Sequence, residues 1–235
     1  MKENSKKLYF LPCIYYILQG FFILLTMKKE GEKKMKTNVK KLVLMAILAA
    51  MSCVLYYFPK FPLPFFPSFL EINFSMLPIL ICGFILGWKE GIAVVFLRFL
   101  VKLLQTHTAG VGETADLFNG IVTVVVAAVS MNLLKDKKHA VLMSLGLASL
   151  AWVITGVVAN YFYNIPQYIN LYFGGNVEPL LGMLDVLPGE VNKGNYMWKY
   201  IIFAVIPFNM IISVVVSIVT YFVEKRIRVL FEEEQ

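Results

Sequence analysis

Residues 140–163 read AVLMSLGLASLAWVITGVVANYFY, an apolar run without a single charged residue. A helix needs about 20 such residues to cross the hydrocarbon core of a bilayer. Similar apolar runs occur on both sides of it, so the pattern predicts several spanning helices. We expect them at approximately 8–26, 41–58, 74–88, 90–106, 116–134, 140–163 and 199–223.

The composition of the whole chain agrees with these runs. Of the 235 residues, 59% are hydrophobic and 16% are charged, and the mean hydropathy is +0.71. A soluble domain has about 45–50% apolar and about 25% charged residues. The composition therefore excludes a soluble enzyme, a nucleic-acid-binding domain and a disordered chain. It predicts an all-α integral membrane protein.

The net charge of +7 is divided unevenly between the two sides of the predicted bundle. With 8–26 set aside, fourteen Lys and Arg residues lie on the side that holds both ends of the other six helices. Only Lys60, Lys193 and Lys199 lie on the opposite side. Basic loops stay in the cytoplasm, so we expect a six-transmembrane-helix bundle with both core termini cytoplasmic.

The segment 8–26 does not fit this alternation. Met35-Lys36-Thr37-Asn38 resembles a natural start that leads directly into an apolar helix. We therefore interpret 1–34 as an N-terminal extension, which either reflects a misassigned start or forms an extra hydrophobic helix. No small-residue cleavage site follows its apolar run, which argues against a signal peptide. Residues 35–235 are the predicted six-helix membrane domain.

The first outward loop, residues 58–70, contains four prolines and five phenylalanines. Proline lacks an N–H donor and fixes φ, so a helix is excluded here. A loop this apolar is poorly solvated in water. It is therefore either an aromatic anchor in the membrane interface or a lid over a binding site that includes Phe66 and Leu70.

The second outward loop leads into a helix that carries Glu113 and Asp116 in its opening turn. Carboxylates at a helix N-terminus either stabilise the helix dipole or accept hydrogen bonds from a polar ligand. Gly110 and Gly112 are not followed by the Gly-Lys-Ser/Thr of a phosphate-binding loop. The third connection, 164–198, is predicted to contain a short interfacial helix around 180–184.

Three polar residues within the predicted spans stand out as candidates for a site. Arg98 and Lys102 are four residues apart and share one helix face. Arg98 lies deep in the membrane, which predicts a functional role and a carboxylate partner, Glu113 or Asp116. Lys102 is expected to snorkel to the surface unless it also belongs to a site. Asn209 follows Pro207 and either binds a ligand or satisfies the carbonyl that the proline frees.

Ala46, Ala49 and Ala50 form a small-residue face on the first core helix. Small residues permit close helix contact in lipid, so this face either packs inside the bundle or docks a partner membrane protein. The sequence contains no Walker, zinc-protease or nucleophile-elbow motif, and its three cysteines are isolated. We therefore expect no enzymatic activity and no metal.

Several short motifs occur together in order: Leu70–Pro78 (LEINFSMLP), Gly83–Gly87 (GFILG), Gly110–Glu113 (GVGE), Asn160-Tyr161-Phe162 with Pro166 and Tyr168, and Pro207-Phe208-Asn209. This ordered set resembles the substrate-binding S component of energy-coupling factor (ECF) vitamin transporters, and within that family the riboflavin-type branch. The similarity covers about 40–225 and leaves 1–34 outside.

The resemblance implies a multi-pass protein of the bacterial plasma membrane that binds a vitamin near its outer face, under the first outward loop. It implies riboflavin as the transported ligand, with no cofactor. It also implies docking through Ala46, Ala49 and Ala50 on a transmembrane coupling subunit, which two ATPase subunits drive. The ligand-binding residues that it suggests are Phe66, Leu70, Asn73, Arg98, Lys102, Glu113, Asn160, Tyr161 and Asn209.

The sequence departs from the riboflavin branch at three positions. Met76 stands where an acidic residue is frequent, Ile212 where a lysine is common, and Arg98 where a lysine is usual, which keeps the charge but changes its geometry. The alternatives are an S component for another vitamin (folate, pantothenate or a pyridoxine-like compound) and a standalone channel or secondary carrier.

Overall fold

The structure is a computed structural model that describes residues 37–106 and 108–232. The chain divides after Ile47 into two units. The first contributes the beginning of helix α2, and the second holds every other described element. The extension 1–34, with its predicted helix at 8–26, lies outside the described residues.

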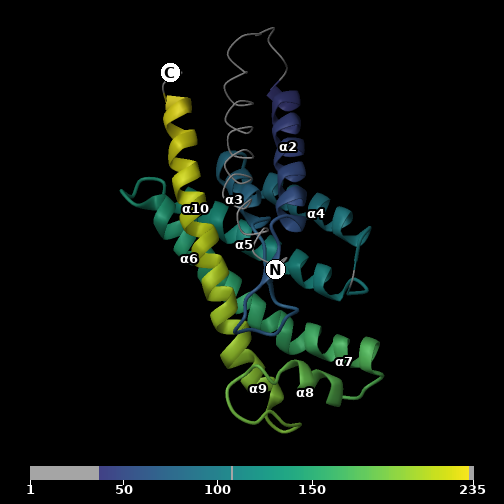
Figure 1. Cartoon of the computed structure of the whole chain (residues 1–235). Coiled ribbons are helices and arrows are strands. Elements are labelled where there is room, and N and C mark those ends of the chain that lie inside the picture. Colours follow the sequence, from purple (N-terminus) through teal and green to yellow (C-terminus); the bar gives the residue numbers. More distant parts are fainter. Residues whose placement is uncertain (1–36, 107, 233–235) are drawn as a thin grey trace, which may run out of the picture. The chain divides into compact units, whose positions relative to one another are not determined.

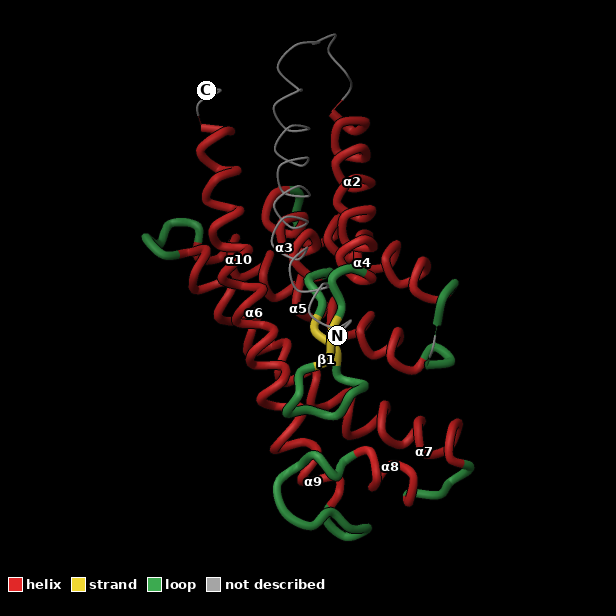
Figure 2. Tube along the Cα trace, in the orientation of Figure 1, coloured by secondary structure: helices red, strands yellow, loops and turns green. Residues whose placement is uncertain are grey.

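The described chain is mainly helical (Figures 1 and 2). The α-helices are α2 (Thr37–Tyr57), α3 (Met76–Ile85), α4 (Trp88–Leu103), α5 (Val111–Leu134), α6 (Ala140–Ala159), α7 (Ile165–Phe173), α8 (Glu178–Met183), α9 (Tyr196–Tyr200) and α10 (Ile206–Glu232). Two π-helical turns, η3 (Asn160–Asn164) and η4 (Ile201–Val205), join α6 to α7 and α9 to α10. Strands β1 (Phe61–Pro62) and β2 (Glu71–Ile72) pair antiparallel, with Phe61 opposite Ile72.

Among the described residues, three helical segments are long and apolar enough to cross a membrane: Val111–Leu134, Ala140–Phe173 and Tyr196–Arg226. Lys41–Tyr57 and Met76–Ile85 are shorter apolar helices. Every predicted span from 41–58 onward thus corresponds to a helix. At 1.5 Å per residue, the ten residues of α3 reach only about 15 Å, about half of the hydrocarbon core.

Two helix boundaries differ from the sequence prediction. Helix α5 begins at Val111 rather than near 116. Helix α6 continues through η3 into α7 and ends at Phe173, although a loop was expected from 164. The helix ends only where Gly174 adopts the left-handed conformation, with φ +56°, that favours glycine. The short helix predicted around 180–184 is confirmed as α8.

Helix α5 is the centre of the second unit, in contact with α3, α4, α6 and η3, while α10 packs along α6 and α3. Two glycines make this packing close. A Cβ atom added at Gly83 or at Gly91 would lie only 2.8 Å or 2.5 Å from Val124 Cγ2 on α5. Helices pack closely in lipid where side chains are small, so these glycines set the distance of α3 and α4 from α5.

Helices α7, α8 and α9 gather at one end of the second unit (Figure 1). Around them lies a hydrophobic cluster with Ile165, Leu184 and Tyr200 at its centre, and Phe66 and Leu70 of the first outward loop pack against it. The loop therefore covers apolar surface, as a lid is expected to do. Phe65 at its tip is 81% exposed, as a residue of an interfacial anchor would be.

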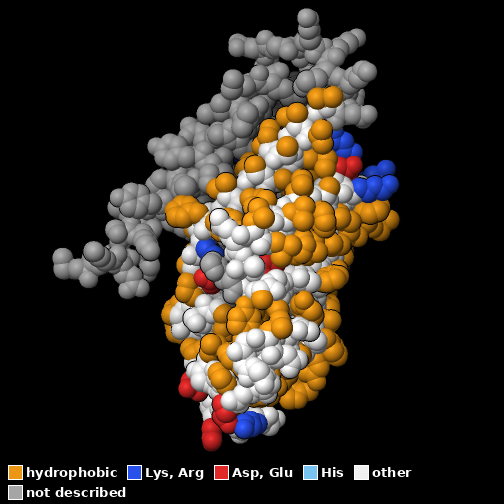
Figure 3. All heavy atoms as spheres, turned by 90° about the vertical axis from the view of Figure 1, so that its right-hand side faces the viewer, with side chains coloured by type: hydrophobic (Ala, Val, Ile, Leu, Met, Phe, Trp, Pro, Cys, Tyr) orange, Lys and Arg blue, Asp and Glu red, His pale blue; other side chains and the backbone are white. Residues whose placement is uncertain are grey.

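The face drawn in Figure 3 is apolar over a wide area, with charged side chains near its upper right, at its lower end and in one group between them. Such a face is expected where helices meet lipid. On α2, Ala49 is buried and packs inside the protein, whereas Ala46 and Ala50 are exposed. The two exposed alanines are four residues apart in the sequence, a spacing that places residues of a helix on one face, and we call them the alanine row.

Candidate functional site

A cavity of about 240 Å³ opens in the second unit between the first outward loop and helices α4, α5, α6, α7 and α10. The lining side chains fall into two chemical groups. Charged and hydroxyl side chains from α4, α5 and the two outward loops form the group that we call the charged end, and carboxamides and aromatic rings from α5, α6 and α10 form the group that we call the amide end. The two ends differ in chemistry and are described in turn.

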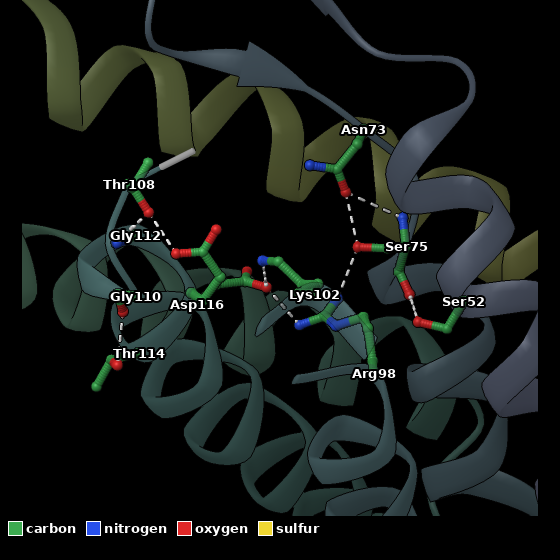
Figure 4. Close-up of polar contacts among 11 residues, drawn as sticks. Ser52, Asn73, Ser75, Arg98, Lys102, Thr108, Gly110, Gly112, Thr114 and Asp116 are labelled. Carbon is green, nitrogen blue, oxygen red and sulfur yellow. Dashed lines mark hydrogen bonds and ion pairs between the residues drawn. The ribbon is translucent and has the colours of Figure 1, made fainter. Parts of the chain in front are cut away.

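The charged end is organised by Asp116 on α5. Its Oδ2 atom lies 2.8 Å from Arg98 Nη2 and 2.7 Å from Lys102 Nζ, so one carboxylate oxygen binds two cations (Figure 4). Arg98 and Lys102 are 1% and 3% exposed. The sequence predicted either Glu113 or Asp116 as the partner of Arg98, and the structure shows that it is Asp116.

Lys102 does not snorkel to the surface, so that expectation was wrong. The physical reason is that its ammonium group finds a carboxylate inside the protein and needs no water. It also lies 3.9 Å from the centre of the Tyr56 ring, a cation–π contact that replaces further hydration. Lys102 and Tyr56 both line the cavity.

Arg98 does not line the cavity, but through Ser75 it orients Asn73, which does. Its Nη1 donates to Ser75 Oγ at 2.6 Å, and Ser75 Oγ donates to Asn73 Oδ1 at 2.7 Å. Ser52 Oγ fixes the same turn by donating to the Ser75 carbonyl at 2.7 Å. The chain of bonds orients the Asn73 carboxamide at the cavity wall (Figure 4).

Glu113 is buried at the start of α5 and also lines the cavity. Thr108 Oγ1 donates to Glu113 Oε2 and accepts the Gly112 N–H at 3.1 Å. Glu113 is therefore held by the preceding loop. A Cβ atom added at Gly112 would lie 3.2 Å from Thr108 Oγ1 and 3.4 Å from the Tyr168 hydroxyl, so all four residues are closely packed.

The amide end is organised by Trp152 on α6. Its Nε1 donates to Asn209 Oδ1 on α10 at 3.0 Å. The side-chain oxygen and nitrogen of Asn119 on α5 are assigned so that both have a hydrogen-bond partner. In this orientation the Asn119 oxygen accepts from the same Trp152 Nε1 at 3.0 Å. One indole N–H thus orients two carboxamides from two helices, and all three side chains line the cavity.

Asn209 also donates through Nδ2 to the Val205 carbonyl at 2.8 Å. The carbonyl that Pro207 deprives of its α-helical donor is that of Phe203, four residues before it. The amide therefore does not satisfy that carbonyl, and the alternative prediction, that it serves the cavity, agrees with its position.

Asn160 is fixed in a similar way. Its Nδ2 donates to the Gly156 carbonyl at 2.8 Å, and its Oδ1 accepts from the Tyr200 hydroxyl at 2.9 Å. Gly156 leaves room for the neighbouring amide, because a Cβ atom there would lie 3.0 Å from the Asn209 carboxamide. The aromatic wall is completed by Phe208, whose ring packs edge-on against Phe66 at 5.6 Å.

The cavity brings together six of the nine predicted ligand-binding residues: Leu70, Asn73, Lys102, Glu113, Asn160 and Asn209. Phe66 and Arg98 lie behind the lining, in contact with Phe208 and Asp116. Tyr161 does not line the cavity, because it is 38% exposed and its ring packs against Phe162 and Trp198. It follows Asn160 directly, so the helix turns it away from the cavity.

Several lining residues were not predicted, among them Tyr56, Asn119, Trp152, Gly156 and Tyr200. A signal was present for two of them. Trp152 carries an N–H donor within an apolar run, and Gly156 follows it at helical spacing. Met76 and Ile212, the positions that depart from the riboflavin branch, also line the cavity.

Residues 40–224 match the sequence profile of a family described as "ECF transporter, substrate-specific component". The "Riboflavin transporter RibU" of Streptococcus thermophilus is 31% identical over 186 residues, which cover 77% of this chain and 80% of that protein. The RibU protein of Staphylococcus aureus is 28% identical over 200 residues, covering 84% and 96%. The "Riboflavin transporter FmnP" of Bacillus subtilis is 28% identical over 185 residues, covering 77% and 88%.

A solved structure, described as "Structure and mechanism of the S component of a bacterial ECF transporter", has the same fold. Its TM-score is 0.62 and its sequence identity is 27%, over 83% of this chain and 99% of that chain. The similarity thus spans almost the entire solved chain.

Proposed function

Because the chain belongs to the family of ECF transporter substrate-specific components, as the match over residues 40–224 shows, we propose that its cavity binds riboflavin for import. The observation that carries the proposal is the division of the cavity into an amide–aromatic end and a charged end. Flat rings stack on aromatic side chains, and amides donate to and accept from the edges of a heterocycle.

Charge balance supports an uncharged ligand. Three cations, Arg98, Lys102 and Lys60, lie at or behind the cavity wall, and each is paired with a carboxylate. The third pair, at the rim, joins Lys60 Nζ to Glu71 Oε2 at 2.5 Å. Glu113 adds a third carboxylate beside Glu71 and Asp116. A neutral ring with a hydroxylated chain finds acceptors and donors here without disturbing an ion pair.

Six helical spans with both core termini in the cytoplasm complete the proposal. The lysine distribution supports this orientation, which puts the cavity and α7–α9 toward the outside. Riboflavin then enters from the outer face, beneath the loop that carries Phe66 and Leu70.

The partners that we propose are a transmembrane coupling subunit and two ATPase subunits. Support comes from family membership and from the exposed row of Ala46 and Ala50 on α2. A small-residue row permits close helix contact in the membrane. The sequence contains no ATP-binding motif, and in this proposal the ATPase subunits supply the energy for import.

Titration of the purified, ligand-free chain with riboflavin tests the proposal directly. Binding quenches free flavin fluorescence, and protein purified from riboflavin-containing medium is yellow. Asn160→Ala should weaken binding by about tenfold, because it removes one acceptor and one donor from the wall. A colourless protein that also fails to bind added riboflavin overturns the proposal, and titration with folate, pantothenate and pyridoxine then tests the other vitamins.

Co-purification with the ATPase subunits tests the docking row. Ala46→Trp and Ala50→Trp should abolish co-purification while riboflavin binding remains. Leu150→Trp, an exposed position on α6, is the matched control and should leave co-purification intact. If both alanine variants still co-purify with the ATPases, the row is not the docking surface.

A further inference from the structure

From Gly156 onward, the helix that runs from α6 into α7 presents four residues to the cavity at intervals of four, Gly156, Asn160, Asn164 and Tyr168, and so continues the spacing of Trp152. A regular α-helix does not keep so long a series on one face. Each residue turns the helix by about 100°, so the last member of such a series would point about 120° away from the first. The regular spacing therefore requires a correction within the helix.

The π turn η3 supplies this correction. The Ile165 N–H bonds the Asn160 carbonyl, five residues back, so the turn holds one residue more than an α-helical turn. With that residue absorbed, Tyr168 points only about 20° away from Gly156. It thereby reaches the packed cluster of Thr108 and Gly112 at the charged end.

The second π turn repeats the arrangement on the opposite wall. The Ile206 N–H bonds the Ile201 carbonyl, also five residues back. Tyr200 and Phe208, on either side of η4, both line the cavity. Each π turn is followed by the dipeptide Ile-Pro, and proline lacks the N–H that would continue an α-helical ladder. The same local sequence thus accompanies the same turn twice.

Asn164, the last residue of η3, has a side-chain oxygen that accepts no hydrogen bond from the described residues. Its Oδ1 is buried and has no hydrogen-bond partner among the described residues, although its side chain lines the cavity. A buried acceptor without a donor is costly, and most such atoms in proteins are paired. A ligand hydroxyl or N–H group is the donor that this position fits.

We propose that η3 is a positioning element, which absorbs one surplus residue and so keeps Asn164 and Tyr168 on the cavity wall, and that Asn164 Oδ1 accepts a hydrogen bond from the ligand. The role of the turn is independent of the ligand. The role of Asn164 rests on the proposed riboflavin binding.

Deletion of Phe162 tests the turn. Phe162 lies inside η3 and is 73% exposed, so its removal costs few contacts. If η3 holds one residue more than the helix needs, the shortened segment forms a regular α-helical turn. The side chains before and after it then still point toward the cavity as in the wild type. The ligand-free protein in detergent should then unfold within about 5 °C of the wild type.

Deletion of Ile154 is the matched control. It is also an exposed residue of the same helix, 54% exposed, but it lies in α6 where no π turn absorbs the change. Its loss rotates Gly156 and Asn160 away from the cavity, and the unfolding temperature should fall by more than about 10 °C. Equal losses in both deletions, or none in either, overturn the role of η3 whether or not the protein binds riboflavin.

Asn164→Leu tests the acceptor, with Asn170→Leu on the exposed face of α7 as its control. Riboflavin affinity should fall at least about tenfold for Asn164→Leu and change less than about twofold for Asn170→Leu. The ligand-free Asn164→Leu protein should be no less stable than the wild type, because an unpaired acceptor is removed. Unchanged affinity in Asn164→Leu, measured on a chain whose wild type binds riboflavin, overturns the role of Asn164.

Discussion

The two ends of the cavity share helix α5 but differ in their chemistry. At the charged end, Asp116 neutralises two buried cations, and most of its interactions are within the protein. At the amide end, Trp152 orients two neutral carboxamides whose remaining donors and acceptors are free for a ligand. The comparison predicts that changes at the charged end mainly lower the stability of the fold, and changes at the amide end mainly lower affinity.

The largest effect is expected for Asp116→Asn. Removal of the carboxylate charge leaves Arg98 and Lys102 buried without a counter-ion, which costs about 3–5 kcal/mol of unfolding free energy. Thermal unfolding of the ligand-free protein in detergent measures the loss. Asp185→Asn, at an exposed loop position, should have no effect. A fully stable Asp116→Asn protein would contradict the stabilising role of the charged end.

Gly156→Ala should strongly reduce affinity at the amide end. The added Cβ lies 3.0 Å from the Asn209 carboxamide and must displace it, and we expect riboflavin affinity to fall about 10–100-fold. Gly146→Ala on the same helix is the control, because nothing lies within 4 Å of its added Cβ. The idea fails if the two variants bind riboflavin equally well.

Trp152→Phe sharpens the comparison within the amide end. The ring is retained, but Asn119 and Asn209 lose the N–H that orients both, so affinity should fall about tenfold. Trp198→Phe, at a position that is 64% exposed, should bind as the wild type does. Equal affinity in both variants would mean that the indole N–H does not orient the amides for binding.

The smallest effect is expected at the rim, for Lys60→Met. The ion pair with Glu71 is partly exposed, with side chains 28% and 33% accessible. Such pairs contribute about 0–1 kcal/mol, so riboflavin affinity should change by less than about threefold. Titration with riboflavin at two salt concentrations measures the change in affinity. A loss of affinity above tenfold would mean that Lys60 contacts the ligand directly.

Much of the fold is predictable because apolar runs and lysine positions are local signals. The run 140–163 predicts a helix whatever its neighbours are. Its continuation to Phe173 is not predictable in the same way, because it depends on the hydrogen bond between Ile165 and Asn160, which composition does not report.

The site is predictable only where a residue type is unusual for its surroundings. Arg98, Glu113 and Asn209 stand out in apolar helices, and all lie at or behind the cavity wall. Tyr161 shows the limit. Whether its side chain reaches the cavity depends on the direction in which the helix turns it and on the packing of its ring against Trp198, and neither is a local property of the sequence.

The placement of the tryptophans has a practical consequence. Trp152 is buried and lines the cavity, whereas Trp88 and Trp198 are 40% and 64% exposed. A chain carrying Trp88→Phe and Trp198→Phe therefore retains one indole emitter in its described part, next to the ligand position. Energy transfer from that emitter to a flavin would give an optical signal of occupancy in intact membranes, without a label.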